Sequence, residues 1–135
     1  MTPIGLAGDI LPSGDILTPS FGLPSMNEGG TVAFKANLAG GEEAILSGQV
    51  GPLTTIASGG SNAFNSPDIN DSGSIAYVER QGVGDETLFV HSGGASTPVA
   101  DTSGDILRID NPSINNSGVV AFEADLDATG AFVGG

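Results

Sequence analysis

Apolar and polar residues alternate with a period of two along much of the chain, which is the pattern of a strand that packs on one face. The alternation is clearest at 31–36, 74–79 and 119–124, where β-branched and aromatic residues are separated by small or polar ones. Each segment follows an Asn-x-x-Gly turn, in which Asn tolerates a left-handed backbone and Gly supplies a positive φ. The pattern therefore predicts an all-β protein built from short hairpins.

The same pattern occurs three times, beginning at Pro24, Pro67 and Pro112. Proline, Asn, Gly, a β-branched residue, Ala and an aromatic residue keep their places in each copy. The spacings are 43 and 45 residues, and a third unit of 47 closes if the chain is read as a circle. We predict one repeat domain, residues 1–135. Its units are 24–66, 67–111, and 112–135 together with 1–23.

Each unit is expected to contain four antiparallel strands, because four strands in about 45 residues is the size of a β-propeller blade. The strands expected in the first unit are 25–27, 31–36, 44–46 and 53–57. Those expected in the second are 68–70, 74–79, 88–90 and 98–100, and those in the third are 113–115, 119–124, 131–133 and 3–7. The chain would then begin on a fourth strand and end on a third, which is the arrangement that closes a propeller ring.

Three blades are too few for a propeller, which typically has about four to eight. Closure by oligomerisation solves this problem, and a homodimer with six blades is favoured because dimers are the commonest closed oligomers. A trimer with nine blades is a second form of the same idea. The alternative fold is a monomeric three-fold β-trefoil or β-prism, which also uses about 45 residues per unit.

The amino-acid composition argues against several classes of function. Glycine occurs 22 times and proline 8 times, which disfavours long helices. There are 16 acidic residues against 3 basic ones, so the net charge of −13 argues against binding to nucleic acid or to an anionic membrane. Cysteine is absent, which excludes disulfides and thiolate zinc sites. No apolar run approaches the roughly 18 residues of a membrane span, and no signal peptide is expected in the chain as given.

The units at 67–77 and 112–122 have the form Pro-x-Ile-Asn-(Asp/Asn)-x-Gly-x-(Ile/Val)-Ala-(Tyr/Phe), and 6–14 has the form of a connection between units. This pattern resembles the tandem repeats of bacterial surface and exported proteins, in particular the choice-of-anchor family with an Asn-x-x-Gly signature. The resemblance implies an extracellular or cell-surface setting and a binding or scaffold role without catalytic residues. That family's basic and acidic positions after the Gly are not kept together in any unit. Its signal and anchor are also missing, so the chain is expected to be a fragment or an engineered three-unit protein.

Polar residues of the first strands are the candidate ligand site, because the inner strands of a propeller line its channel. A small polar molecule, an ion or a glycan is the expected ligand there. The residues predicted to line the channel are Ser25, Asn27, Asp68, Asn70, Ser113 and Asn115.

A calcium site is a further candidate in the second unit. Asp68, Asn70 and Ser72 form the D-x-N-x-S-G opening of a calcium loop. Ser25 and Ser113 stand in the place of Asp68 in the other units, and an Asn-Gly hairpin turn explains the same residues without an ion. No other cofactor is predicted.

Acidic residues recur between the second and third strands, at 41–43, 84–86 and 125–127. A ring would gather these loops on one face as a solvated acidic rim. They suggest an alternative function, a carbohydrate-binding (lectin-like) or carbohydrate-active protein, but the chain has no Trp and one Tyr with which to hold a sugar. His91 is the only histidine and is expected to be a surface residue rather than part of a Ser-His-acid triad. The leading hypothesis is a non-enzymatic, self-assembling repeat module.

Overall fold

The computed structural model describes residues 24–49, 53–60, 63–82, 84–104 and 106–126, and the backbone of 17–21. Strands make up the architecture and no helix occurs in these residues, so the all-β prediction is confirmed. Within the same residues, no helix of the length and apolarity needed to cross a membrane is found. The strands are β1 (Leu17–Phe21), β2 (Ser25–Met26), β3 (Val32–Leu38), β4 (Glu43–Gly48), β5 (Thr54–Gly59), β6 (Asp68–Ile69), β7 (Ile75–Gly82), β8 (Asp85–Ser92), β9 (Ala95–Asp101), β10 (Ile106–Ile114) and β11 (Val120–Leu126).

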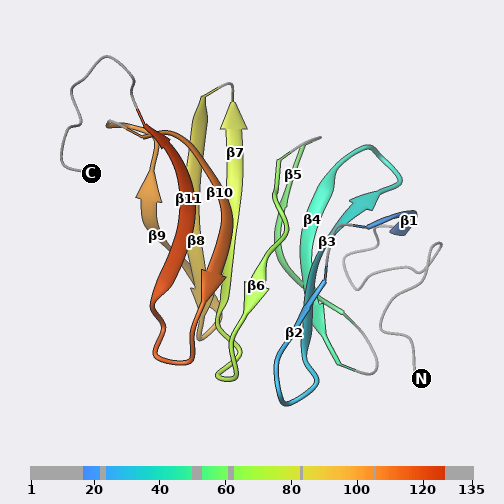
Figure 1. Ribbon diagram of the computed structural model, residues 1–135. Helices are drawn as coiled ribbons and strands as arrows, with labels where there is room; N and C mark the ends of the chain where they lie inside the picture. The colour runs from blue at the N-terminus through green and yellow to red at the C-terminus, as the bar shows by residue number, and fades with distance from the viewer. Residues whose placement is uncertain are drawn as a thin grey trace.

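The strands form three antiparallel sheets that follow one another along the chain. The first sheet has the order β1-β3-β4-β5, with β2 also paired to β3. The second has the order β6-β7-β8-β9, and the third is the β10-β11 hairpin. The three sheets are stacked beside one another, with the second between the other two (Figure 1).

Three Asn-Gly turns join β2 to β3, β6 to β7 and β10 to β11, at the positions predicted. In the first, Gly30 N donates to Asn27 O (3.1 Å), and the Asn27 side-chain Oδ1 accepts the N–H of Thr31 (2.9 Å). Asn70 and Asn115 make the same bonds in their turns. The glycines close these turns with φ of +87° at Gly30, +86° at Gly73 and +85° at Gly118, a backbone region that other L-residues rarely adopt. Asn and Gly therefore recur for a local reason.

Hydrophobic cores fill the spaces between the sheets. Ala33 and Ile45 of the first sheet pack against Ile69 and other residues of the second, and against Phe64, which precedes β6 and is bridged to Glu79. A separate core joins the second sheet to the third. Its buried members are Ala76, Val78, Leu88, Ile109 and Ile114. Alternation along β3 and β7 produces these cores, because successive side chains point to opposite faces of a sheet.

Tyr77 lies at the centre of an aromatic cluster in the second sheet. Its ring stacks on Phe89 (centroids 5.4 Å apart) and meets Phe64 edge to face at 6.0 Å. The hydroxyl donates to Ser96 Oγ (2.8 Å), which satisfies the polar atom of a buried side chain. Burial raises the pKa of the Tyr77 phenol, and the nearby Glu79 carboxylate adds to the increase, while the bond to Ser96 opposes it.

The raised pKa of Tyr77 gives a direct test of the core. Because the chain contains one tyrosine, the phenolate absorbance should titrate as a single group above the ordinary pKa of 10.0 in the folded protein and near it in denaturant. The neutral phenol favours the folded state, so its stabilisation is complete below the unfolded pKa and is lost as pH rises through the folded pKa. A native titration at or below the denatured midpoint would contradict the burial of this ring.

Two segments differ from the predicted unit limits. β10 is one strand from Ile106 to Ile114, so it crosses the predicted boundary at 111/112. β1, which those limits place in the third unit, pairs instead with β3 in the first sheet, Leu17 opposite Leu38. β1 extends the first sheet beside β3, and the first half of β10 extends the third sheet beside β11. Both pair through backbone groups, which do not require an alternating apolar pattern. The strands predicted at 131–133 and 3–7 lie outside the described residues.

Candidate functional site

The predicted channel residues lie together, but they form a ladder of hydrogen bonds between the sheets. Asn27 Nδ2 donates to the backbone oxygen of Asn70 (3.0 Å), and Asn70 Nδ2 donates to that of Asn115 (2.9 Å). Each of these side chains therefore holds its own turn with Oδ1 and the next sheet with Nδ2. We call this set of contacts, with those of Asp68 and of the turn tips below, the inter-sheet ladder.

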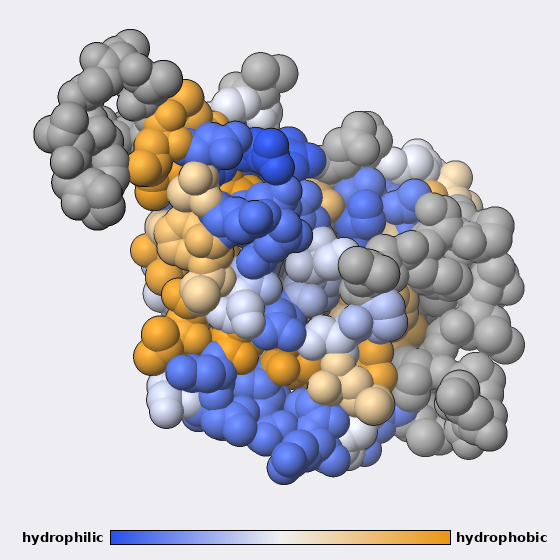
Figure 2. Space-filling model, viewed as in Figure 1, coloured by the Kyte–Doolittle hydropathy of each residue, from blue (hydrophilic) through white to orange (hydrophobic). Residues whose placement is uncertain are grey.

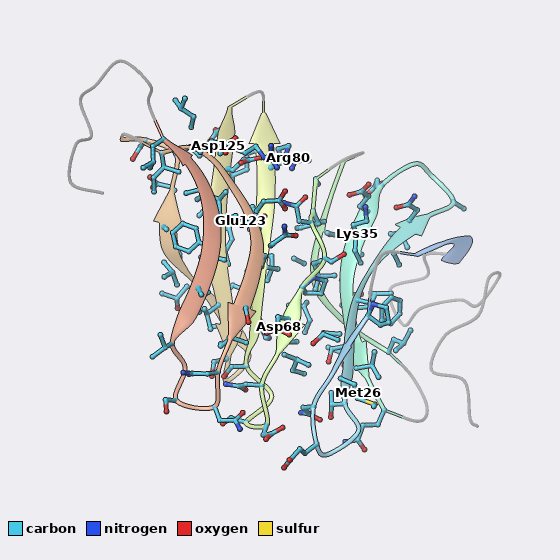
Figure 3. The ribbon with its side chains drawn as sticks, in the orientation of Figure 1. Met26, Lys35, Asp68, Arg80, Glu123 and Asp125 are labelled. Carbon is cyan, nitrogen blue, oxygen red and sulfur yellow. The ribbon has the colours of Figure 1, made fainter. Side chains whose placement is uncertain are left out.

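Asp68 joins all three sheets. Its Oδ1 accepts a hydrogen bond from Ser25 Oγ in the first sheet (2.7 Å), and its Oδ2 accepts the N–H of Ile114 in the third (2.8 Å). Ser25 Oγ in turn accepts the N–H of Ile69 (3.2 Å). Figure 3 shows Asp68 on β6, between β2 and β10. The side chain that begins each short strand thus accepts an N–H from the next sheet.

The tips of the turns repeat this arrangement at the surface. Glu28 N donates to Asp71 Oδ1, and Asp71 N donates to Asn116 Oδ1, both at 2.8 Å. Asn116 Nδ2 also donates to Asp71 Oδ2 (2.8 Å). The turns form the hydrophilic lower edge of the molecule (Figure 2). These contacts span 43 to 45 residues of sequence, so they join equivalent positions of neighbouring sheets.

The ladder uses most of the polar atoms in the middle sheet that a ligand would need. Both oxygens of Asp68 and the Oδ1 of Asn70 accept hydrogen bonds from protein donors, so a cation would have to displace them. Ser72 is exposed in the turn. Within the described residues, no three His, Cys, Asp or Glu side chains are grouped to hold a metal. Ser113 and Asn115 are exposed at the outer end of the ladder.

Replacing Asp68 by Ala should lower the free energy of unfolding by about 2 kcal/mol, because it removes two hydrogen bonds and leaves the Ile114 N–H without its acceptor. Chemical denaturation measures the loss. Ser72→Ala, at the exposed turn position, should change stability by less than about 0.5 kcal/mol.

We expect no difference in melting temperature between calcium and chelator for the unmodified chain. A calcium-dependent increase that Asp68→Ala abolishes would instead assign these oxygens to an ion.

Two glutamates that the sequence places on a solvated rim are buried. Glu43 Oε1 accepts the backbone N–H of Phe64 (3.1 Å), and Lys35 Nζ lies 3.7 Å from its Oε2. Glu86 Oε1 accepts the N–H of Ile109 (2.7 Å), and its Oε2 binds Arg80 Nε at 2.7 Å. The rim prediction is therefore wrong for these two residues. Glu43 thus reaches from the first sheet to the segment before β6, where Phe64 is bridged to Glu79, and Glu86 reaches from the second sheet to β10 of the third.

The basic residues were the signal for this role. The chain has 3 of them against 16 acids, yet Lys35 on β3 and Arg80 on β7 lie within reach of a glutamate near the start of the following strand, Glu43 on β4 and Glu86 on β8. A cation that is rare in a chain is expected where it neutralises a buried carboxylate, since unpaired burial of a charge is costly.

His91 contacts a neighbouring serine at the surface. Its Nδ1 lies 3.0 Å from Ser96 Oγ, which also accepts the Tyr77 hydroxyl. His91 on β8 is half-buried and lies opposite the exposed Ser96 on β9. In the described part of the chain no acidic side chain is bonded to the imidazole, so the arrangement is a serine–histidine contact rather than a triad.

An open hollow of about 310 Å³ lies over the β10-β11 hairpin. Its charged walls are already paired, since Arg108 binds Asp110 (2.7 Å) and lies 3.6 Å from Asp125. These carboxylates raise the pKa of Arg108. Glu123, a further wall residue, accepts a hydrogen bond from the Asn111 side chain. Figure 3 shows Glu123 and Asp125 on β11.

The polar residues that recur in the three turns thus bind neighbouring sheets of the same chain. Comparison with known proteins finds no matching family model, no matching curated protein and no matching solved structure.

Proposed function

We propose that this chain is a non-enzymatic, self-assembling β-propeller repeat module that acts as a structural or binding scaffold. The observation that carries the proposal is the inter-sheet ladder. The same Asn side-chain to backbone bond joins the first sheet to the second and the second to the third. Stacked blades require equivalent contacts between successive sheets, because each blade contacts only the blades next to it.

A homodimer with six blades is the assembly that we favour, with a nine-bladed trimer as the second form. Face-to-face stacking of the sheets supports blades over the monomeric β-trefoil or β-prism. By its resemblance to exported repeat proteins, we place the module outside the cell or at the cell surface. A ligand, small molecule or glycan, would bind to the assembled ring.

No observation favours the alternative carbohydrate function. Of the acids on which it depends, Glu43 and Glu86 are buried and bound to backbone amides, so they are not available to a sugar. The one tyrosine is buried against Phe64 and Phe89, where it offers no face to a ligand.

The mass in solution tests the proposal. We expect a particle of twice the 13.3 kDa of the chain in sedimentation or light scattering. Two copies of charge −13 repel one another, so salt should strengthen the dimer by screening, with a Debye length of about 10 Å at 0.1 M. A particle of 13.3 kDa at all concentrations and salt conditions would reject the assembled ring.

A further inference from the structure

The inter-sheet ladder has two open ends that complement one another. We define the head as Met26, Asn27 and Glu28 of the first sheet, and the tail as Ser113, Asn115, Asn116 and Ala121 of the third. We propose that the tail of one copy of this chain binds the head of a second copy in the register of the internal ladder. The inference rests on the proposed self-assembly, and it adds the surfaces, the polarity and the register of the contact.

Burial at equivalent positions identifies the two ends. Ile69 and Ile114 are 6% and 7% exposed because a preceding sheet covers them, whereas Met26, at the same position of the first sheet, is 67% exposed. The tail carries the opposite surface, the one that covers the next sheet elsewhere in the chain. Ala33 and Ala76 are fully buried against the next sheet, and Ala121, in their place on the third sheet, is exposed. Figure 2 shows hydrophobic surface on the β11 side of the molecule.

The hydrogen-bonding groups of the two ends match. Asn27 and Asn70 each donate through Nδ2 to the next sheet, but Asn115 Nδ2 has no acceptor among the described residues. In a head-to-tail contact it would donate to Asn27 O of the second copy. By the same register, Ser113 Oγ would accept the N–H of Met26, and Asn116 N would donate to the Glu28 carboxylate.

The polarity of the ladder selects this contact over the symmetric ones. A head offers the backbone oxygen of Asn27, and a tail offers the amide donor of Asn115, so neither end can reproduce the ladder with a copy of itself. Farther along β3, Phe34 is 7% exposed, so the head is limited to the exposed β2 edge and its turn. In a two-copy ring this contact occurs twice, and the second forms intramolecularly, which strengthens a small interface.

Cysteine cross-linking tests the register, because the chain has no cysteine of its own. Glu28→Cys and Asn116→Cys are made as separate variants, both at exposed turn tips, then mixed and oxidised. We expect a covalent dimer that contains one chain of each variant. The double variant Asp71→Cys/Asn116→Cys is the matched control, since this internal pair occupies the same register and should close within one chain.

The outcomes separate the inference from the proposal on which it rests. A particle of twice the chain mass that cross-links as 28–28 or 116–116, or not at all while the control closes, overturns the head-to-tail register but leaves self-assembly standing. A monomer under all conditions overturns both.

A second measurement does not depend on disulfide geometry. Met26→Glu should raise the dimer dissociation constant about tenfold or more, because it places a charge where an apolar side chain would be buried. Val99→Glu, at a similarly exposed residue of β9, should leave the constant within about twofold. Circular dichroism of both variants should match the unmodified chain, since both side chains are exposed. Equal effects of the two variants would remove Met26 from the interface.

Discussion

Glu86→Ala should lower the free energy of unfolding by about 2–4 kcal/mol, which is a large part of the 5–15 kcal/mol of a typical domain. The substitution leaves the buried N–H of Ile109 without an acceptor and removes the carboxylate that Arg80 Nε binds at 2.7 Å. Urea denaturation followed by circular dichroism measures the change.

Two matched variants separate the causes. Glu86→Gln keeps an oxygen for the Ile109 amide and loses the charge, so its cost should be smaller, about 1 kcal/mol. Asp85→Ala removes the adjacent exposed acid and should stay within about 0.5 kcal/mol. Should Glu86→Ala cost no more than Asp85→Ala, the carboxylate would be a solvated surface group, as the acidic-rim reading expected.

Ile109→Ala should cost about 2–5 kcal/mol, because this side chain is fully buried between the second and third sheets. It contacts the core that contains Val78 and Leu88, and its removal leaves a cavity there. Thermal or chemical unfolding gives the loss directly.

Leu107 on the same strand is the matched control. It is 53% exposed, and Leu107→Ala should change stability by less than about 0.5 kcal/mol. Equal losses for the two variants would place the third sheet away from the second and would remove the stacked arrangement. If Ile109→Ala proves insoluble, Ile109→Val gives the same comparison at a cost of about 0.5–1.5 kcal/mol.

Local chemistry made the hairpins predictable. The turns at Asn27, Asn70 and Asn115 follow from Asn and Gly at fixed places, and the short strands β2 and β6 were expected at nearly the observed residues. β1 and the first half of β10 were not expected as strands of their sheets. They pair through backbone groups at sheet edges, and such pairing does not require an alternating pattern.

The contacts of the inter-sheet ladder, in contrast, could not be predicted from local patterns. The recurrence of Asn70 was explained by its turn, and the turn uses its Oδ1 alone, so nothing indicated that Nδ2 holds the next sheet. The D-x-N-x-S-G motif and its place on a first strand favour Asp68 as a channel or calcium ligand. No local pattern indicates its actual partners, Ser25 and Ile114, because they lie 43 and 46 residues away. Only the stacking of the sheets shows that its carboxylate is used within the protein.

The ladder also bears on how such a chain could change in length. Asn27 and Asn70 each donate to a backbone oxygen, and every residue supplies one, so the receiving sheet needs no particular side chain at that point. A duplicated hairpin inserted between two sheets would meet the same donor on one side and present the same donor on the other. Lengthening by duplication, or exchange of one sheet for another, would therefore preserve these bonds without compensating substitutions.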